Sequence, residues 1–209
     1  MIIAIDGPAA AGKGTIADRL AMHYRLPHLD TGLLYRAIAR DMAERGLNVD
    51  DPKAAGKAAR ALNPTMLGDP QLRGRETGEL ASRVSVHEPV RAALVKFQRD
   101  FANRPGGAVL DGRDIGTAIC PEAEVKIFVT ASPEVRALRR TNELRVKGRD
   151  VTFERILGEI RERDARDSSR AVAPLKAAPD AHLLDTTHLT ADEAFKAALA
   201  IVEAHRKPK

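Results

Sequence analysis

The sequence predicts an α/β protein whose five-stranded parallel sheet is covered by helices on both faces. Two observations lead to this fold class: short apolar runs of strand length recur along the chain, and helical patterns separate them. Alternation of this kind is typical of a parallel sheet buried between two layers of helices. The predicted strands cover residues 2–5, 26–30, 108–110, 125–129 and 182–184.

The helices between these runs are predicted from apolar spacing and from capping residues. Ile16, Leu20 and Tyr24 recur every fourth residue after the first strand, which places them on one face of a helix. Two later helix starts carry an N-cap residue before a proline, or the spacing of a capping box. These are Ser132 with Pro133, and Thr190 with Glu193.

Two segments depart from this alternation. Residues 50–90 are rich in Pro and Gly, lack a strong strand, and are predicted to form a small helical or irregular insertion. Residues 136–170 hold ten Arg and one Lys against seven Asp or Glu. With few aromatic residues to stack on bases, this cluster suits phosphate groups better than single-stranded nucleic acid, but a solvated helical face of mixed charge explains it equally well.

The composition bounds the class of protein. The 209 residues are 44% hydrophobic but only 3% aromatic, so one aliphatic, alanine-rich core is expected. Cys120 is the only cysteine, which excludes an internal disulfide and favours a reducing compartment, and no favourable setting marks it as a nucleophile. No secretory signal precedes the first strand, and no apolar run approaches the roughly 20 residues of a membrane span. We therefore expect a cytoplasmic protein without a membrane partner.

Four of the predicted strands end at an acidic residue. These residues are Asp6, Asp30, Asp111 and Asp185. In open α/β sheets the ligand lies beyond the carboxyl ends of the strands, so some of these side chains are expected to face it. Because Asp is also a common turn former, about half of the four are expected to be only that.

Residues 7–15 read GPAAAGKGT and lie between the first predicted strand and the first predicted helix. This is the setting of a P-loop, whose backbone N–H groups surround phosphates and whose lysine, here Lys13, reaches the β- and γ-phosphates. Gly14 stands where the strict motif has a Ser or Thr that binds Mg²⁺, and Thr15 is expected to supply that hydroxyl instead. The GKGT form resembles that of nucleoside monophosphate kinases, and the guanine motif of GTPases is absent from the sequence.

Three further stretches sharpen this resemblance. They are DTGLLYR at 30–36, LDGRDIGT at 110–117 and ERDARDSSRAVAPL at 162–175, with support from ASRV and PVRAAL between 81 and 94. Together with the P-loop they resemble the bacterial cytidylate kinase family. The family motif more often reads Asp-Ser-Gly where this chain has Asp30, Thr31 and Gly32, so the hydroxyl is kept and a methyl group is added.

The resemblance implies a P-loop NTPase-type three-layer sandwich that forms one domain over residues 1–209. Within it, residues 31–95 would be an insertion that binds the acceptor nucleotide, and residues 136–170 an arginine-rich lid. The implied reaction moves the γ-phosphoryl group of ATP to CMP or dCMP, with Mg²⁺ bound through ATP and Thr15. Its partners are small nucleotides rather than nucleic acid, and a monomer is expected.

The resemblance also implies roles for individual residues. The ATP site would comprise the P-loop and three arginines of the lid: Gly7, Pro8, Ala9, Ala10, Ala11, Gly12, Lys13, Gly14, Thr15, Arg139, Arg140 and Arg166. In the CMP site, the residues that read cytosine would be Ser82, Arg91 and Asp114, and those that hold the sugar Arg163 and Asp167. The phosphates would be held by Arg36, Arg113 and Arg170, with Thr31 and Tyr35 lining the pocket. The residues expected to act on the transferred group are Lys13, Arg113, Arg163 and Arg170.

The side chains themselves agree with these roles but leave alternatives open. Arg163, Asp167 and Arg170 share one helical face, where they form either a clamp for phosphate and sugar or a stripe of surface salt bridges. Arg113 offers a planar fork for phosphate, and Asp114 can accept from the exocyclic amine of cytosine. The competing functions are a kinase of the same fold with another acceptor and, from a different class, an RNA-binding module gated by ATP.

Overall fold

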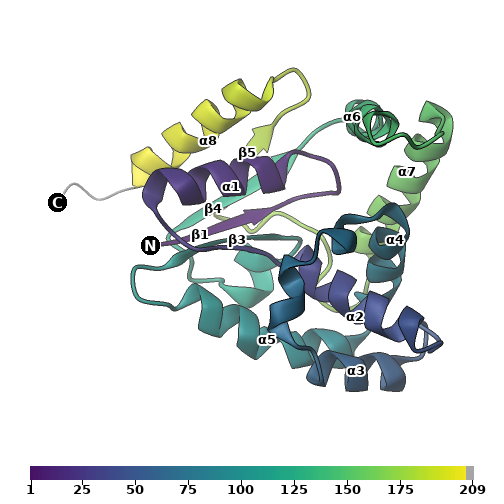
Figure 1. The fold of residues 1–209 in the computed structure, drawn as a ribbon. Helices are drawn as coiled ribbons and strands as arrows, with labels where there is room; N and C mark the ends of the chain where they lie inside the picture. Colours follow the sequence, from purple (N-terminus) through teal and green to yellow (C-terminus); the bar gives the residue numbers. More distant parts are fainter. Residues whose placement is uncertain (206–209) are drawn as a thin grey trace.

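The computed structural model describes residues 1–205 and contains one five-stranded parallel sheet (Figure 1). Its strands are β1 (Ile2–Asp6), β2 (His28–Asp30), β3 (Ala108–Gly112), β4 (Val125–Thr130) and β5 (His182–Asp185). They lie in the order β2-β3-β1-β4-β5, and every neighbouring pair is parallel. The predicted fold class and all five predicted strands are confirmed.

The strands are connected by helices, as the alternation predicts. The α-helices of the described residues are α1 (Lys13–Tyr24), α2 (Gly32–Glu44), α3 (Pro52–Arg60), α4 (Arg75–Val84), α5 (Glu88–Ala102), α6 (Pro133–Val146), α7 (Phe153–Ser169) and α8 (Ala191–His205). Two short 3₁₀ helices, η1 (Pro64–Gly68) and η2 (Pro70–Arg73), precede α4, and one π turn, η3 (Ile115–Ile119), follows β3. The segment 50–90 is thus mostly helical.

The predicted capping residues begin the helices to which they were assigned. The Ser132 hydroxyl accepts from the Val135 N–H at 3.3 Å at the start of α6. Before α8, the Thr190 hydroxyl accepts from the Glu193 N–H at 3.2 Å, and the Glu193 carboxylate accepts from the Thr190 N–H at 2.9 Å. Both orphan donors are therefore satisfied reciprocally, which is the capping box.

The two faces of the sheet are covered by different helices, with α1 and α8 on one side and α5 on the other (Figure 1). Side chains alternate along β1 because successive residues of a strand point to opposite faces. Ile3 and Ile5 pack with α1 and α8, whereas Ala4 packs with β3, η3 and the end of α5. Among residues 1–205, no helix combines the length and the apolar character that crossing a membrane requires.

Two helical regions stand beside the sheet with apolar clusters of their own. Helices α2 to α5 share a cluster of buried aliphatic side chains that includes Leu34, Met42 and Leu94. Helices α6 and α7 lie next to each other at one end of the molecule (Figure 1), packed through Leu144, Ile156 and neighbours. Separate packing lets each region keep its own shape beside the sheet.

Strands β1 and β3 extend beyond their apolar runs, and the acids at the strand ends take part in the backbone pairing of the sheet. Asp6 pairs with Gly112 in the register of β1 and β3, and Asp30 pairs with Asp111 in the register of β2 and β3. The acids were expected at the ends of the strands, and they are part of the ladder because backbone pairing does not depend on side-chain polarity. Backbone pairing therefore fixes the positions from which these carboxylates project at one edge of the sheet.

Candidate active site

Three of the four strand-end acids lie on adjacent strands at the carboxyl edge of the sheet, and the fourth forms a turn. Asp185 is exposed and accepts from the Thr187 N–H at 2.8 Å. Asp6, Asp30 and Asp111 end or nearly end the three strands β1, β2 and β3. Asp30 also accepts from the amide two residues on, the Gly32 N–H at 3.0 Å, so two of the four acids form local turns, in line with the expectation for about half of them.

The P-loop leaves β1 through a backbone that only glycine fits. Gly7 has a φ of 146°, and a Cβ there would lie 1.9 Å from the carbonyl oxygen of Val129. Gly12, with a φ of 94°, turns the chain into α1. Lys13 is the first residue of α1, and its Nζ donates to the Pro8 carbonyl at 2.7 Å. The loop thus curls around its own lysine.

The charge of Lys13 is perturbed by its surroundings. Burial, followed by the positive charge of Arg113, lowers the pKa of Lys13 from 10.5 to about 7, and Arg163 contributes in the same direction. Both arginines come from segments predicted to hold the acceptor. A bound polyanion next to Lys13 would restore the charge of its ammonium group, since a nearby negative charge favours the protonated form.

A cavity of about 280 Å³ lies beside the P-loop, between α1 and α8. Its lining residues are Ala11, Gly12, Thr15, Ile16, Arg139, Thr186, Leu189, Thr190, Ala191 and Ala194. Arg139 is fixed there by donating to the Thr186 hydroxyl at 3.0 Å and to the carbonyls of Thr186 and Leu189 at 2.6 and 3.2 Å. The Thr186 hydroxyl in turn lies 3.0 Å from the Ala11 carbonyl of the P-loop. We name this space the P-loop cavity.

Arg136 connects the P-loop to α7 and was not singled out by the sequence. It is 3% exposed, and its Nη1 donates to the Ala9 carbonyl of the P-loop at 3.2 Å. Both terminal nitrogens also bind the Asp164 carboxylate, at 3.0 and 2.5 Å. One arginine among ten in its segment carries no sequence signal for such a role, because the pairing depends on how α6 and α7 pack.

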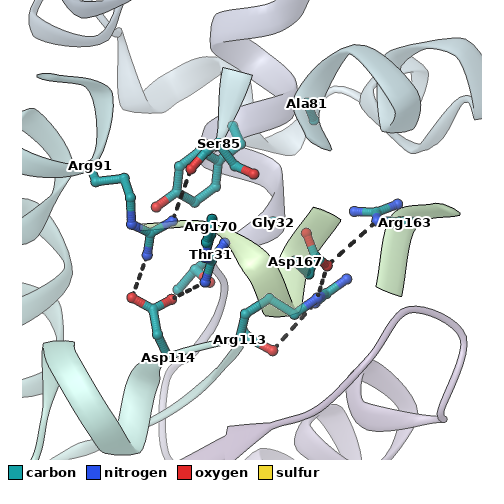
Figure 2. Close-up of a pocket in the computed structure, with 12 residues that line it drawn as sticks. Thr31, Gly32, Ala81, Ser85, Arg91, Arg113, Asp114, Arg163, Asp167 and Arg170 are labelled. Carbon is teal, nitrogen blue, oxygen red and sulfur yellow. Dashed lines mark hydrogen bonds and ion pairs between the residues drawn. The ribbon is translucent and has the colours of Figure 1, made fainter. Parts of the chain in front are cut away.

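A second cavity, of about 50 Å³, lies where β3, α2, α4, α5 and α7 meet (Figure 2). Its lining residues are Thr31, Gly32, Tyr35, Ala81, Ser85, Arg91, Gly112, Arg113, Asp114, Arg163, Asp167 and Arg170. We name it the central cavity. Eight of the ten residues predicted for the CMP site line it, although their segments are far apart in the sequence.

Two buried carboxylates in the central cavity each face two arginines (Figure 2). Asp114 forms an ion pair with Arg91 and lies 3.6 Å from Nη2 of Arg170. Asp167 lies 3.0 Å from Nε of Arg113 and 3.9 Å from Nε of Arg163. The cavity therefore contains more positive than negative charge.

The pKa directions reflect this excess of positive charge. Burial raises the pKa of Asp167, but the charges of Arg113 and Arg163 outweigh burial and hold it below its ordinary value. Burial, followed by the charge of Arg113, lowers the pKa of Arg163 to about 10. The Asp167 carboxylate is thus ionised, and the arginines are the groups that a further anion would stabilise.

Two arginine nitrogens in the central cavity have no hydrogen-bond acceptor within residues 1–205. They are Nε of Arg163 and Nη2 of Arg170, both buried. A buried donor without an acceptor costs about 1–3 kcal/mol, more when it belongs to a charged group. Such atoms are expected where a ligand supplies the missing acceptor.

Two residues predicted for the CMP site lie outside the central cavity. Arg36 donates to the carbonyls of Leu72 and Gly74, at 2.9 and 2.8 Å, and so is held by η2 and the residue that follows it. Ser82 is buried, and its hydroxyl accepts from Arg166 at 2.8 Å. Ser85, three residues on, lines the cavity instead and was not predicted.

Thr31 and Tyr35 contribute the α2 side of the central cavity. The Thr31 hydroxyl donates to the Asp111 carbonyl at 2.8 Å, so it ties the start of α2 to β3. Burial raises the pKa of Tyr35 to about 12, and the Arg91 guanidinium lies 5.6 Å from the centre of its ring. The ring thus supports the arginine that pairs with Asp114.

Of the three arginines predicted to approach ATP, the structure brings only Arg139 to the P-loop cavity. Arg140 pairs with Glu143 on its own helix at 2.7 Å. Arg166 reaches α4, where it pairs with Glu79 at 2.8 Å besides binding Ser82. Because both lie on α6 or α7, their distance from the P-loop depends on the position of these helices.

Helices α4 and α7 are joined by ion pairs above the central cavity. Arg75 of α4 and Glu159 of α7 form a bidentate pair. The contacts of Arg166 with Glu79 and Ser82 add a second connection. We name these contacts the α4–α7 bridge.

Comparisons with known proteins agree with this geometry. The family model for cytidylate kinase matches residues 3–204. A cytidylate kinase of Methylocella silvestris is 61% identical over 204 residues, which cover 98% of this chain and 94% of that protein. A cytidylate kinase of Xanthobacter autotrophicus is 59% identical over 206 residues, with 99% of each chain covered.

Solved structures share the fold at low identity. An uncharacterized protein from Eubacterium ventriosum superposes with a TM-score of 0.58 at 15% identity, covering 98% of this chain and 99% of the other. At that identity the likeness supports the α/β architecture alone. The family follows from the sequence match over nearly the whole chain: this protein belongs to the cytidylate kinase family.

Proposed function

We propose that the protein transfers the γ-phosphoryl group of ATP to CMP or dCMP, giving ADP and CDP or dCDP. The observation that carries the proposal is the proximity of the two cavities. Lys13 of the P-loop lies close enough to Arg113 and Arg163 of the central cavity for their charges to lower its pKa. A donor phosphate at Lys13 and an acceptor phosphate at these arginines would therefore meet.

On the donor side, residues 7–15 would hold the triphosphate, and the P-loop cavity would hold the adenine. Residues 1–205 contain no group of three or more His, Cys, Asp or Glu side chains that would cage a metal. Mg²⁺ does not require one, because it is commonly bound by one or two protein oxygens together with phosphates and waters. The Thr15 hydroxyl, exposed in the first turn of α1, fits that role. The positive charge of a metal ion held there with ATP would offset the negative charge of the phosphates.

On the acceptor side, Asp114 and Arg91 would read the cytosine, since a carboxylate can accept from its amine and a guanidinium can donate to its ring acceptors. Ser82 would assist them. Arg163 and Asp167 would hold the sugar. The residues proposed to bind the acceptor phosphate are Arg36, Arg113 and Arg170, with Thr31 and Tyr35 as walls of the pocket.

The chemistry requires positive charge rather than a general base. The phosphate of a nucleoside monophosphate has a second pKa near 6, so it is mostly dianionic at neutral pH and is itself the nucleophile. Lys13, Arg113, Arg163 and Arg170 would neutralise the repulsion between two polyanions and stabilise the charge of the transferred group. The unpartnered nitrogens of Arg163 and Arg170 support this assignment.

Entry of a nucleotide requires movement of the helical regions. A cavity of about 50 Å³ is several times smaller than ligand pockets, which hold on the order of 300 Å³ or more. We infer that residues 31–95 act as an acceptor-binding flap and residues 136–170 as a lid. Closure over both substrates would exclude water and bring Arg140 and Arg166 towards ATP. The protein is expected to act as a cytoplasmic monomer.

A panel of acceptors tests the proposal. ADP release from ATP is measured in a coupled assay with CMP, dCMP, UMP, AMP and GMP. CMP and dCMP are expected to give the highest kcat/KM, because cytosine offers an amine next to the ring acceptors that Asp114 and Arg91 would read, whereas uracil lacks that amine and the purines are larger. A higher kcat/KM for any other member of the panel would overturn the assignment.

A further inference from the structure

Asp6 ends the strand that leads into the P-loop, yet its carboxylate binds the other side of the site. One oxygen accepts from the Ile115 N–H at 2.8 Å, and the other accepts from the Gly116 N–H at 2.7 Å. The side chain is buried, with 5% of the residue exposed. These two amides directly follow Asp114, which pairs with Arg91 in the central cavity.

At the start of η3, the Asp114 carboxylate cannot both accept from the amides of its own turn and pair with the arginines of the central cavity. Asp114 occupies the N-cap position of this turn, where an Asp side chain normally accepts from the first free amides of its own helix. Here Asp114 makes no such bond and points to Arg91 and Arg170 instead (Figure 2). Asp6 supplies the acceptors from a neighbouring strand, so the Asp114 carboxylate stays in the cavity.

Gly116 permits this close approach. A Cβ at Gly116 would lie 3.2 Å from Cδ of Lys126 and 3.4 Å from Oδ2 of Asp6. The glycine backbone is therefore held between the β4 lysine and the β1 carboxylate with little room for a side chain. Without a side chain at this position, the Gly116 N–H lies close enough to donate to the Asp6 carboxylate.

We propose that Asp6 is a positioning residue for the acceptor base: it binds the amides of Ile115 and Gly116, and thereby holds the Asp114 carboxylate towards the central cavity. The inference rests on the proposed function, in which Asp114 reads cytosine. Burial raises the pKa of Asp6 to about 6, so at pH 7.5 the carboxylate is mostly ionised and both oxygens accept. Selectivity for the acceptor thus depends on the residue next to the donor loop.

The test is Asp6→Asn, which keeps the shape of the side chain but turns an NH₂ group towards one of the two amides. Loss of a buried hydrogen bond to a charged group shifts Asp114, and the ratio of kcat/KM for CMP to that for UMP is expected to fall about tenfold. KM for CMP is expected to rise more than KM for ATP. A role in stability alone would lower Tm and leave the ratio unchanged, which would overturn the proposal.

Asp185→Asn is the matched control, because Asp185 also ends a strand and accepts a loop amide but lies on the surface. It is expected to keep the wild-type ratio. If Asp6→Asn does not fold, Asp6→Glu tests the same contact, because it keeps the charge but moves the carboxylate by one methylene group relative to the two amides: a reduced ratio supports the proposal, and a wild-type ratio overturns it.

Wild-type selectivity separates this inference from the proposed function. If the wild type does not prefer CMP to UMP, the cytosine assignment fails. The rise of KM for the best acceptor relative to KM for ATP in Asp6→Asn then decides the role of Asp6. If the wild type prefers CMP and Asp6→Asn keeps that preference in full, only the inference fails.

Discussion

The two cavities of this protein are built in opposite ways. The P-loop consists of nine consecutive residues, positioned by glycine backbone conformations and by the start of α1, and the P-loop cavity adds Arg139 and side chains of residues 186–194 to it. The central cavity is formed by side chains from β3, α2, α4, α5 and α7, held by ion pairs with one another. One site is fixed by the backbone, and the other by charges that a ligand can rearrange.

This difference assigns different tasks to the two sites. A backbone cradle binds any triphosphate without changing its own geometry, so it contributes binding and orientation but little selection between acceptors. In the central cavity, Asp114 and Asp167 form ion pairs with arginines that the acceptor would also contact. In the proposed function, binding there would exchange internal ion pairs for contacts with the nucleotide, and selection would follow from how well that exchange succeeds.

Lys13→Ala is expected to have the largest effect, because its charge lies where the donor phosphates would be. Removing it should reduce kcat by about a thousandfold, in the range known for the loss of one preorganised electrostatic contact. Steady-state kinetics at saturating ATP and CMP measure this. Affinity for CMP alone, measured by calorimetry, should change little. Near-normal kcat would contradict the role of Lys13.

Arg91→Ala is expected to act on the acceptor side alone. It leaves the buried Asp114 carboxylate with only Arg170, at 3.6 Å, and should lower kcat/KM for CMP by about 100-fold. KM for ATP should stay within about twofold, because Arg91 is remote from the P-loop cavity lining. Lys96→Ala on the same helix is the control, since its pair with Asp100 is exposed. Equal losses for ATP and CMP would refute the division into two sites.

The sequence predicted the donor side in detail because its information is contiguous. Strand, glycine spacing, lysine and helix follow one another within residues 2–24, and the backbone needs each of them at that spacing. The five strands followed from apolar runs for the same local reason. The ends of the strands did not follow from the apolar runs, because the backbone hydrogen bonds of the sheet continue through Asp6 and Asp111, where the side chains are polar.

The central cavity was predicted only through family motifs, and its pairings were not. Asp114 pairs with Arg91, and Asp167 pairs with Arg113, across more than 20 residues of sequence. Nothing local indicates which of many arginines reaches which acid. The contacts of Arg136, Asp6 and Ser85 were missed for the same reason: they form only after the helices and strands pack. Arg36 and Ser82 were predicted to bind CMP, and their contacts with a ligand remain a prediction.

Breaking the α4–α7 bridge should have a smaller effect. Glu159→Gln removes the charge that pairs with Arg75, and exposed pairs contribute about 0.2–1 kcal/mol. Because the central cavity must open for a nucleotide, the association rate constant of CMP should rise by up to about fivefold, as measured by stopped-flow binding. Glu134→Gln, which breaks the pair with Arg161 outside the bridge, is the control. A slower or unchanged association would show that the bridge does not limit entry.

Proton uptake on ATP binding should be the smallest effect. With its pKa lowered to about 7, Lys13 is mostly neutral at pH 8, and a bound triphosphate would raise that pKa again. Binding at pH 8 should therefore take up as much as about one proton. Calorimetry in two buffers of different ionisation enthalpy measures it, and Lys13→Met should abolish it.

The same shift fixes the sign of a stability effect. Between pH 7 and 10.5, the unfolded chain binds more protons at Lys13 than the folded protein does. The contribution of Lys13 to the free energy of unfolding therefore rises with pH across this window. A contribution that falls with pH in the difference between wild type and Lys13→Met would contradict the lowered pKa.

Hydrogen exchange tests the contrast between the two sites most directly. CMP alone is expected to change amide exchange in residues 75–84 and 153–169, because its binding must rearrange the ion pairs that join α4 and α7. A nonhydrolysable ATP analogue alone is expected to protect residues 7–16 and to change α4 far less. If CMP leaves amide exchange in α4 and α7 unchanged while the ATP analogue alters it, acceptor binding does not rearrange the ion pairs between these helices. That result would contradict the proposed contrast between the two sites.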